Sequence, residues 1–167
     1  IGLTGPATQP DDAATGVPPV ATYTLDGDSG ASVTDVSGNG LNASWIGTPA
    51  YASGVSGSAV AISSGKNYVK LPLVAGKTDA SGSFSYAFWM QLQSRTSYGT
   101  LMSNQNFVSC NNAGITLYNQ TTTGVLQACW GQSPGGTKEY LNGATPNIQG
   151  TWHHIAVTVD RTANQVK

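Results

Sequence analysis

Hydrophobic and polar residues alternate in short segments along most of the chain, from residue 21 to residue 160. Alternation of this kind places apolar side chains on one face of a β-strand and polar ones on the other. Gly, Pro, Ser or Asn bound the segments and favour turns. No window has the spacing of an amphipathic helix, so the sequence predicts an all-β protein. The predicted strands are 21–25, 33–36, 41–47, 58–63, 67–73, 84–92, 99–103, 114–120, 124–130 and 151–160.

Two of these segments define the expected core most clearly. In the segment 84–92, Phe84, Tyr86 and Phe88 share one face, whereas Trp89 lies on the other. The segment 151–160 alternates in the same way, with Ile155 on its apolar face. Antiparallel sheets bury such faces most simply against each other, so a two-layer sandwich or a barrel is expected.

The start of the chain has a different composition. Residues 1–19 hold four of the eight prolines and no aromatic residue, which is typical of a semi-extended linker. The remaining length suits one domain with a two-layer core and is too short for two domains of ordinary size. We therefore predict a linker over 1–19, tethering a single domain over 20–167 to a larger protein.

Charge and hydropathy exclude several classes of partner. Charged residues make up only 9% of the chain, and the net charge is −1. Such a balance offers no basic surface for nucleic acid or anionic lipid. Apolar runs such as 84–90 are far shorter than the roughly 18 residues that span a bilayer. Neither nucleic-acid binding nor membrane insertion is expected.

The two cysteines, Cys110 and Cys129, flank a predicted hairpin. A disulfide between them fits a chain with few charges and many Ser, Thr and Asn residues, and it indicates an oxidising compartment. The alternative is a pair of separate buried thiols. We predict the disulfide, and with it a secreted or extracellular location.

Three motifs, in this order, resemble a known family. They are D-x-S-G-N-G at 35–40, F-x-x-x-F-W at 84–89 and W-H-H-I-A-V-T-V-D at 152–160. Together they resemble the laminin-G-like, concanavalin A-like domains of secreted bacterial proteins, over residues 21–167. The resemblance implies an antiparallel two-sheet jelly-roll sandwich and a binding role.

The end of the sequence departs from the family pattern. In the family, the segment that matches VTVDRTANQVK runs on into several further strands, whereas this sequence stops at Lys167. The resemblance therefore implies a jelly roll that lacks its C-terminal strands in this chain. We expect those strands on a second polypeptide or outside the sequence in hand.

The glycine-punctuated stretch TDVSGNGLNAS, 34–44, has two interpretations. In the family a structural calcium is often held at this corner, and Asp35, Asn39 and backbone carbonyls, with Asp26 or Asp28, offer oxygen ligands. The alternative is a tight turn in which Asp35 and Asn39 bond to nearby backbone while Gly38 and Gly40 take positive φ.

Catalytic chemistry is not expected. Glycosidases use two carboxylic acids at a set separation, and Glu139 is the only glutamate in the chain. His153 and His154 are neighbours on a predicted strand, so their side chains point to opposite faces and cannot chelate one metal ion together.

Carbohydrate binding is the function that remains. Sugar sites use aromatic rings against the apolar faces of pyranoses, with amides and hydroxyls to fix orientation. Trp130, beside a glycine-rich loop, is the first candidate, Trp89 the second and Tyr118 the third; each has packing in the core as its alternative.

We therefore predict a non-catalytic, secreted module of a larger protein that binds carbohydrate or a glycan-bearing surface. The competing prediction is a structural or assembly module without a glycan ligand, completed by a second polypeptide that supplies the missing strands.

Overall fold

A computed structural model describes residues 18–63, 66–75, 82–93, 99–104, 114–119, 125–131, 138–142 and 149–167. Every ladder between its named strands is antiparallel, and the described residues form no helix. The all-β prediction is confirmed. The strands are β1 (Ser32–Val33), β2 (Ala43–Ile46), β3 (Tyr51–Ser53), β4 (Ser58–Val60), β5 (Tyr68–Lys70), β6 (Phe84–Gln91), β7 (Gly99–Ser103), β8 (Gly114–Asn119), β9 (Leu126–Gly131), β10 (Lys138–Asn142), β11 (Trp152–Asp160) and β12 (Gln165–Val166).

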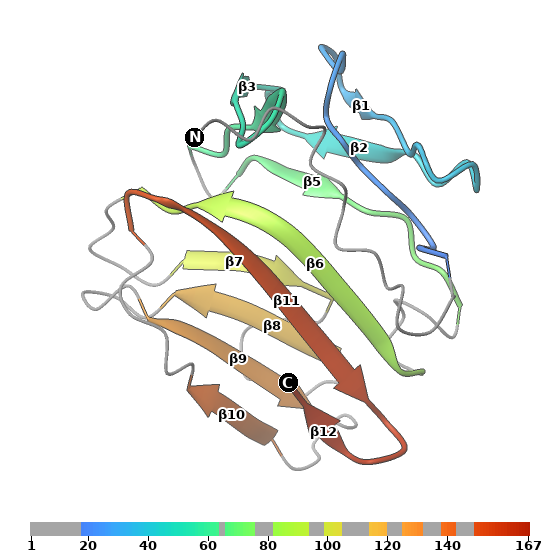
Figure 1. The fold of residues 1–167 in the computed structure, drawn as a ribbon, viewed down its shortest axis with the longest axis vertical. Coiled ribbons are helices and arrows are strands. Elements are labelled where there is room, and N and C mark those ends of the chain that lie inside the picture. The colour runs from blue at the N-terminus through green and yellow to red at the C-terminus, as the bar shows by residue number, and fades with distance from the viewer. Residues whose placement is uncertain are drawn as a thin grey trace, which may run out of the picture. The chain divides into compact units, whose positions relative to one another are not determined.

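Two compact units make up the chain, Ile1–Pro72 (unit 1) and Leu73–Lys167 (unit 2). Each has its own sheets, which Figure 1 colours from blue to green for unit 1 and from green to red for unit 2. The predicted linker 1–19 lies almost wholly outside the described residues. In the part of the chain that is described, no helix is long and apolar enough to cross a membrane.

Unit 1 holds a three-stranded sheet, in the order β1-β2-β5, and the hairpin β3-β4. The alternation in β2 buries Ala43 and Trp45, which pack with Val33 of β1. The indole Nε1 of Trp45 donates to the hydroxyl of Tyr51 at 3.0 Å, and that hydroxyl donates to the carbonyl of Gly30 at 3.0 Å. The polar ends of both rings are thus satisfied at the edge of an otherwise apolar cluster.

The turn after β1 is held by one carboxylate. Asp35 is 8% exposed. Its Oδ1 accepts the N–H groups of Thr22 and Ser37, and its Oδ2 accepts the Ser37 hydroxyl and the Leu41 N–H, each at 2.9 Å. The bond from Thr22, followed by those from Ser37 and Leu41, lowers the pKa of Asp35 far below its usual range, although burial opposes the shift. Asp35 therefore remains ionised and ties three separate backbone segments together.

The predicted strand 21–25 is wrong. Thr22 gives its N–H to Asp35 and its carbonyl to the N–H of Val36, so both of its backbone groups bond to the turn and not to a strand ladder. Leu25 has φ 65°, a left-handed conformation that interrupts extended structure. Side-chain bonds to backbone compete here with sheet formation. They also shorten the predicted strand 33–36 to Ser32–Val33, because Thr34 N–H bonds to Asp28.

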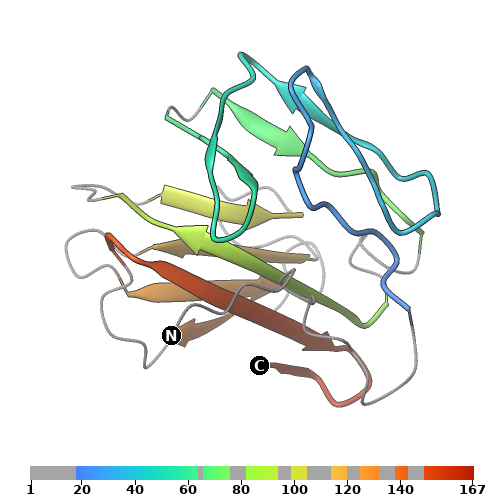
Figure 2. The ribbon, with the colours of Figure 1, turned by 45° about the horizontal axis from the view of Figure 1, so that its top comes forward.

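Unit 2 is a sandwich of two antiparallel sheets, β10-β9-β8-β7 and β12-β11-β6. Figures 1 and 2 show the strand pair β6–β11 lying over the sheet of β7 to β10. The space between them is filled from both layers by one apolar cluster. Its buried members are Leu92, Ile115, Leu117, Leu126, Ala128, Trp130, Ile155, Val157 and Val159.

The longest predicted strands are confirmed nearly residue for residue. β6 alternates between half-buried and exposed side chains, with Phe84 and Phe88 packed on the core and Trp89 facing out. The strands β3, β10 and β12 were not predicted. β3 and β12 are three and two residues long, too short to show a periodicity, and β10 forms because β9 offers it a five-residue antiparallel ladder.

Replacing a core residue tests the sandwich of unit 2. Ile115→Ala removes a side chain that is 0% exposed, and we expect it to lower the free energy of unfolding by about 2–5 kcal/mol. Leu73→Ala, at a side chain 73% exposed, should change it by less than about 0.5 kcal/mol. Urea unfolding followed by circular dichroism measures both; equal effects would contradict the assigned core.

Asp35→Asn tests the turn of unit 1. The asparagine amide places N–H groups against backbone N–H donors, so we expect the melting temperature to fall by several degrees at pH 7. Because the pKa of Asp35 is lowered on folding, its contribution is present above about pH 4 and is lost as the pH falls below that value. The difference between wild type and variant should therefore shrink in acid, as thermal melts from pH 7 to pH 2 would show.

Asp28→Asn is the matched control for this turn, because the Asp28 carboxylate accepts hydrogen bonds, within the described residues, from exposed Thr34 alone. We expect a smaller loss in melting temperature. A loss as large as that of Asp35→Asn would show that Asp35 has no special role.

Candidate functional site

Trp130, the first candidate for sugar binding, lies in the core of unit 2. Its side chain is 2% exposed and belongs to the apolar cluster between the sheets. The guanidinium carbon of Arg161 lies 5.1 Å from the centre of its ring, a cation–π contact. Burial lowers the pKa of Arg161. This is the packing alternative left open by the sequence, and Trp130 offers no surface for a ligand.

Tyr118 is also buried, at 6% exposure. It packs with Cys129 in a cluster of its own, separate from the inter-sheet core. The two side chains come from β8 and β9, which pair through six residues each. Tyr118 therefore occupies a packing position as well.

Trp89, in contrast, is 47% exposed. The register places it directly opposite His154, and the two ring centroids are 5.2 Å apart at an interplanar angle of 58°. His154 is exposed too. Contact along one side holds the indole in place while its other surfaces remain accessible to solvent. A rigid, exposed aromatic ring of this kind is typical of a binding surface.

The neighbours of this pair form one continuous surface, because directly opposed residues of an antiparallel pair share a face. We call it the Trp89 surface: Ser85, Ala87, Trp89 and Gln91 of β6 with Trp152, His154, Ala156 and Thr158 of β11. Ala87 and Ala156 are paired beside the two rings, so the surface is low there. The Trp89 surface thus combines an aromatic ring, an apolar floor formed by these two alanines, and polar groups at both ends.

Polar side chains at each end of the Trp89 surface are fixed by hydrogen bonds. The Nε2 of Gln91 donates to the carbonyl of Gly150 at 2.9 Å. At the opposite end the hydroxyls of Ser85 and Thr158 are 3.1 Å apart. An amide and two hydroxyls thus flank the apolar floor in defined positions, and groups of these kinds fix the orientation of ligands in binding sites.

The matching family is described as the concanavalin A-like lectin/glucanases superfamily, and its model covers residues 63–167. The chain belongs to this family. The match confirms the resemblance and includes all of unit 2, with the Trp89 surface. No curated protein matches the chain.

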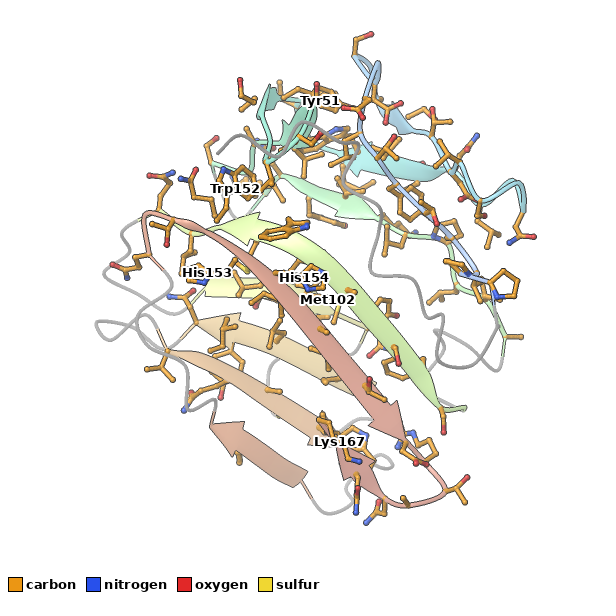
Figure 3. The ribbon with its side chains drawn as sticks, viewed as in Figure 1. Tyr51, Met102, Trp152, His153, His154 and Lys167 are labelled. Carbon is orange, nitrogen blue, oxygen red and sulfur yellow. The ribbon has the colours of Figure 1, made fainter. Side chains whose placement is uncertain are left out.

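The paired histidines of the concanavalin A-like domain lie as the sequence predicted. Figure 3 shows them following Trp152 at the start of β11. His154 is on the exposed face, while His153 is half-buried and its Nε2 lies 2.8 Å from the hydroxyl of Thr151. Neighbouring side chains on opposite faces cannot share a metal ion.

The predicted calcium ligands are engaged in other contacts. Each oxygen of Asp35 already accepts two hydrogen bonds, which occupy the lone pairs that a cation would need. Asp26 accepts the N–H of Ser58, and the Nδ2 of Asn39 donates to the carbonyl of Val20. Gly38 and Gly40 have φ 90° and 71°, as the turn interpretation requires.

These hydrogen bonds therefore favour the interpretation of residues 34–44 as a tight turn over their interpretation as a metal site. Among the described residues, no three His, Cys, Asp or Glu side chains gather as they would around an ion. Calcium at this corner stays a prediction that rests on the family resemblance.

Sequence reasoning missed His154, Gln91 and Ala156 as members of a site. Their positions on exposed faces were readable from the alternation in 84–92 and 151–160. The sequence could not show the register that places Trp89 beside His154 and Ala87 beside Ala156. Two strands with the same alternating pattern can pair in many registers.

The disulfide also stays a prediction. Cys129 is 0% exposed, whereas Cys110 lies outside the described residues. We expect the denatured, unreduced protein to take up no iodoacetamide, and the reduced protein to take up two equivalents, as measured by mass spectrometry. Reduction should lower the free energy of unfolding by about 3 kcal/mol. Two adducts without reduction would indicate separate thiols.

Proposed function

We propose that the concanavalin A-like domain is a non-catalytic, extracellular module that binds carbohydrate on the Trp89 surface. The observation that carries the proposal is the exposed indole of Trp89, held against His154 and flanked by a low apolar floor. A pyranose ring laid over this floor buries its apolar face against the indole and keeps its hydroxyls near the polar ends of the surface.

The polar groups support a sugar rather than a lipid or a fully apolar partner. Gln91 lies at one end of the paired strands β6 and β11, and the hydroxyls of Ser85 and Thr158 lie near the other end. The aromatic pair and the two alanines lie between them. Hydroxyl-rich ligands need such donors and acceptors at the rim of an apolar contact. The surface spans several residues along two strands, which favours an oligosaccharide chain over a single monosaccharide.

A non-catalytic role is supported by the positions of the described acids. Asp26, Asp28 and Asp35 bond to backbone N–H groups in unit 1. Asp160 accepts the N–H groups of Thr162 and Ala163, in the turn between β11 and β12. None of these acids belongs to the Trp89 surface, and each stabilises a turn or a strand end through its hydrogen bonds.

The extracellular location is supported by the predicted disulfide and by the low charge of the chain. Attachment to a larger protein, through the Pro-rich residues 1–19, would place the module beside a partner domain and keep it near a glycan-bearing surface.

Trp89→Ala tests the proposed site. A glycan array identifies a ligand for the wild type, and isothermal titration then compares affinities. Burial of one aromatic side chain contributes ~1.5–3 kcal/mol, so we expect Kd to rise about tenfold or more. Trp89→Phe, which keeps a ring in place, should retain part of the affinity.

Tyr140→Ala is the matched control, because Tyr140 is an aromatic residue of β10 that is 53% exposed and lies outside the Trp89 surface. It should leave Kd unchanged. Equal losses in both variants, an unchanged Kd in Trp89→Ala, or a folded wild type that binds no glycan would each count against the proposal.

A further inference from the structure

The three-stranded sheet of unit 1 has one covered face. Side chains alternate across a strand, so Ala43 and Trp45 of β2 point to the same side of the sheet as Val69 of β5, which lies opposite Trp45. All three pack in the apolar cluster of unit 1. This packing fixes the sheet, and with it the residues that alternate onto the other face.

The other face of this sheet is exposed. Tyr68 lies directly opposite Ile46, and Lys70 lies directly opposite Ser44. Opposed residues of an antiparallel pair share a face. The side chains of Tyr68 and Ile46 are 48% and 38% exposed, and those of Ser44 and Lys70 are exposed too. We call these four residues, with Lys66, the Tyr68 surface.

Lys66 belongs to this surface because it is exposed and stands two positions before Tyr68, in the turn that leads into β5. The turn is held against the end of β2, where the N–H of Thr48 donates to the Oδ1 of Asn67 at 3.3 Å. Gly47 permits this approach, because a Cβ there would collide with the same Oδ1. The backbone that carries Lys66 is thus fixed beside β2.

The polar groups of the Tyr68 surface are not engaged, in contrast to those nearby. The hydroxyls of Tyr23 and Tyr51 both donate to backbone carbonyls of unit 1. The hydroxyl of Tyr68 has no such partner in the part of the chain that is described, and neither do the ammonium groups of Lys66 and Lys70. Three polar groups beside an exposed ring are therefore available to a ligand.

The charges of unit 1 are unevenly placed. Lys66 and Lys70 are the only basic residues in its sequence. Its described acids, Asp26, Asp28 and Asp35, accept backbone N–H groups in turns and form no ion pair with either lysine. Two positive charges without a counter-charge thus stand before and after one aromatic ring. Such a surface is complementary to an anionic ligand.

We propose that the Tyr68 surface binds an acidic polysaccharide, a chain whose sugars carry carboxylate or sulfate groups. A sugar ring packs on Tyr68 and Ile46, and the anionic groups pair with Lys66 and Lys70. Four residues of extended chain span about 13 Å, which favours a polymer with repeated charges over a single small anion. The proposal concerns a face of unit 1 and does not rest on the Trp89 surface of unit 2.

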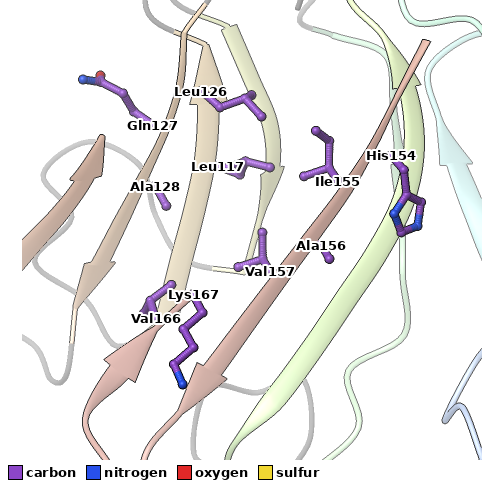
Figure 4. Close-up of a pocket in the computed structure, with 10 residues that line it drawn as sticks. All are labelled: Leu117, Leu126, Gln127, Ala128, His154, Ile155, Ala156, Val157, Val166 and Lys167. Carbon is purple, nitrogen blue, oxygen red and sulfur yellow. The ribbon is translucent and has the colours of Figure 1, made fainter. Parts of the chain in front are cut away.

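The cavity in unit 2 has the opposite chemistry. It measures about 320 Å³ and lies between the two sheets of that unit. Figure 4 shows Leu117 and Leu126 of one sheet pointing toward Ile155 and Val157 of the other. A mostly aliphatic lining has few groups that bind a carboxylate, a sulfate or a sugar hydroxyl. Of these two places, the Tyr68 surface is the one that matches an acidic glycan.

Dextran and dextran sulfate of equal chain length are matched probes, and carboxymethyl dextran carries carboxylates on the same backbone. Isothermal titration measures their binding to the folded chain. We expect both anionic polymers to bind, and their affinity to fall as sodium chloride screens the lysines. Neutral dextran should bind at least tenfold more weakly, since it lacks the groups that pair with them.

Three variants test the surface from the protein side. Lys66→Gln and Lys70→Gln each remove one charge and should each raise Kd for dextran sulfate about fivefold. Tyr68→Ala removes the ring and should raise it by a similar factor. All three positions are exposed, so circular dichroism should show a folded chain in each case.

Lys167→Gln is the matched control for charge, because Lys167 is an exposed lysine of unit 2. Tyr140→Ala is the control for an exposed ring of unit 2. Both should leave Kd for dextran sulfate unchanged. Trp89→Ala should also bind it as the wild type does, which separates this surface from the one proposed for carbohydrate in unit 2.

The proposal is overturned if the folded wild type binds neither anionic polymer, or if neutral dextran binds as tightly as dextran sulfate. An unchanged Kd in Tyr68→Ala, or a loss in Lys167→Gln as large as that in Lys70→Gln, would reduce the binding to unspecific attraction and overturn it too. Tighter binding of single-stranded DNA than of either polymer would assign the surface to nucleic acid instead.

Discussion

The ladder between β6 and β11 is the constraint on which unit 2 depends. It joins Phe84 through Gln91 to Trp152 through Val159 without a register shift. Because side chains alternate across a strand, this one register assigns every residue of both strands to a face. Phe88 and Ile155 face the interior of the sandwich, whereas Trp89 and His154 face solvent. A slip by one residue would bury Trp89 and expose Phe88, so core and candidate surface are set together.

Unit 1 is organised by a different kind of interaction. Its strands are short, and hydrogen bonds between side chains and backbone hold its segments together, as longer strand ladders do in unit 2. Asp35 is bonded to residues on both sides of the turn and to Thr22, thirteen positions earlier. Tyr51 joins Trp45 to Gly30. Glycine at 38 and 40 supplies the conformations that this turn requires.

Alternation predicted the fold class and the long strands because each of those strands has one apolar face. It failed where side-chain hydrogen bonds, burial of both faces of a strand, or the register between two strands determines the structure. The segment 21–25 alternates, yet Asp35 takes the N–H of Thr22. β9 is buried along nearly its whole length, so periodicity could not tell whether Trp130 packs or binds, and the structure shows that its side chain is buried. Trp89 was placed correctly because β6 alternates strictly. Its partner His154 was not found, since register is a property of two segments and not of one.

The four tryptophans sit in very different surroundings. Trp45 and Trp130 are buried, Trp152 is half-buried, and Trp89 alone among them is largely exposed. Indole emission shifts to the red in water, and a dissolved quencher reaches only rings that solvent reaches. The domain thus carries its own optical reporter. Iodide quenching should act mainly on the red-edge emission of Trp89, and whatever covers that ring would shield it while the blue emission of the interior indoles stays constant.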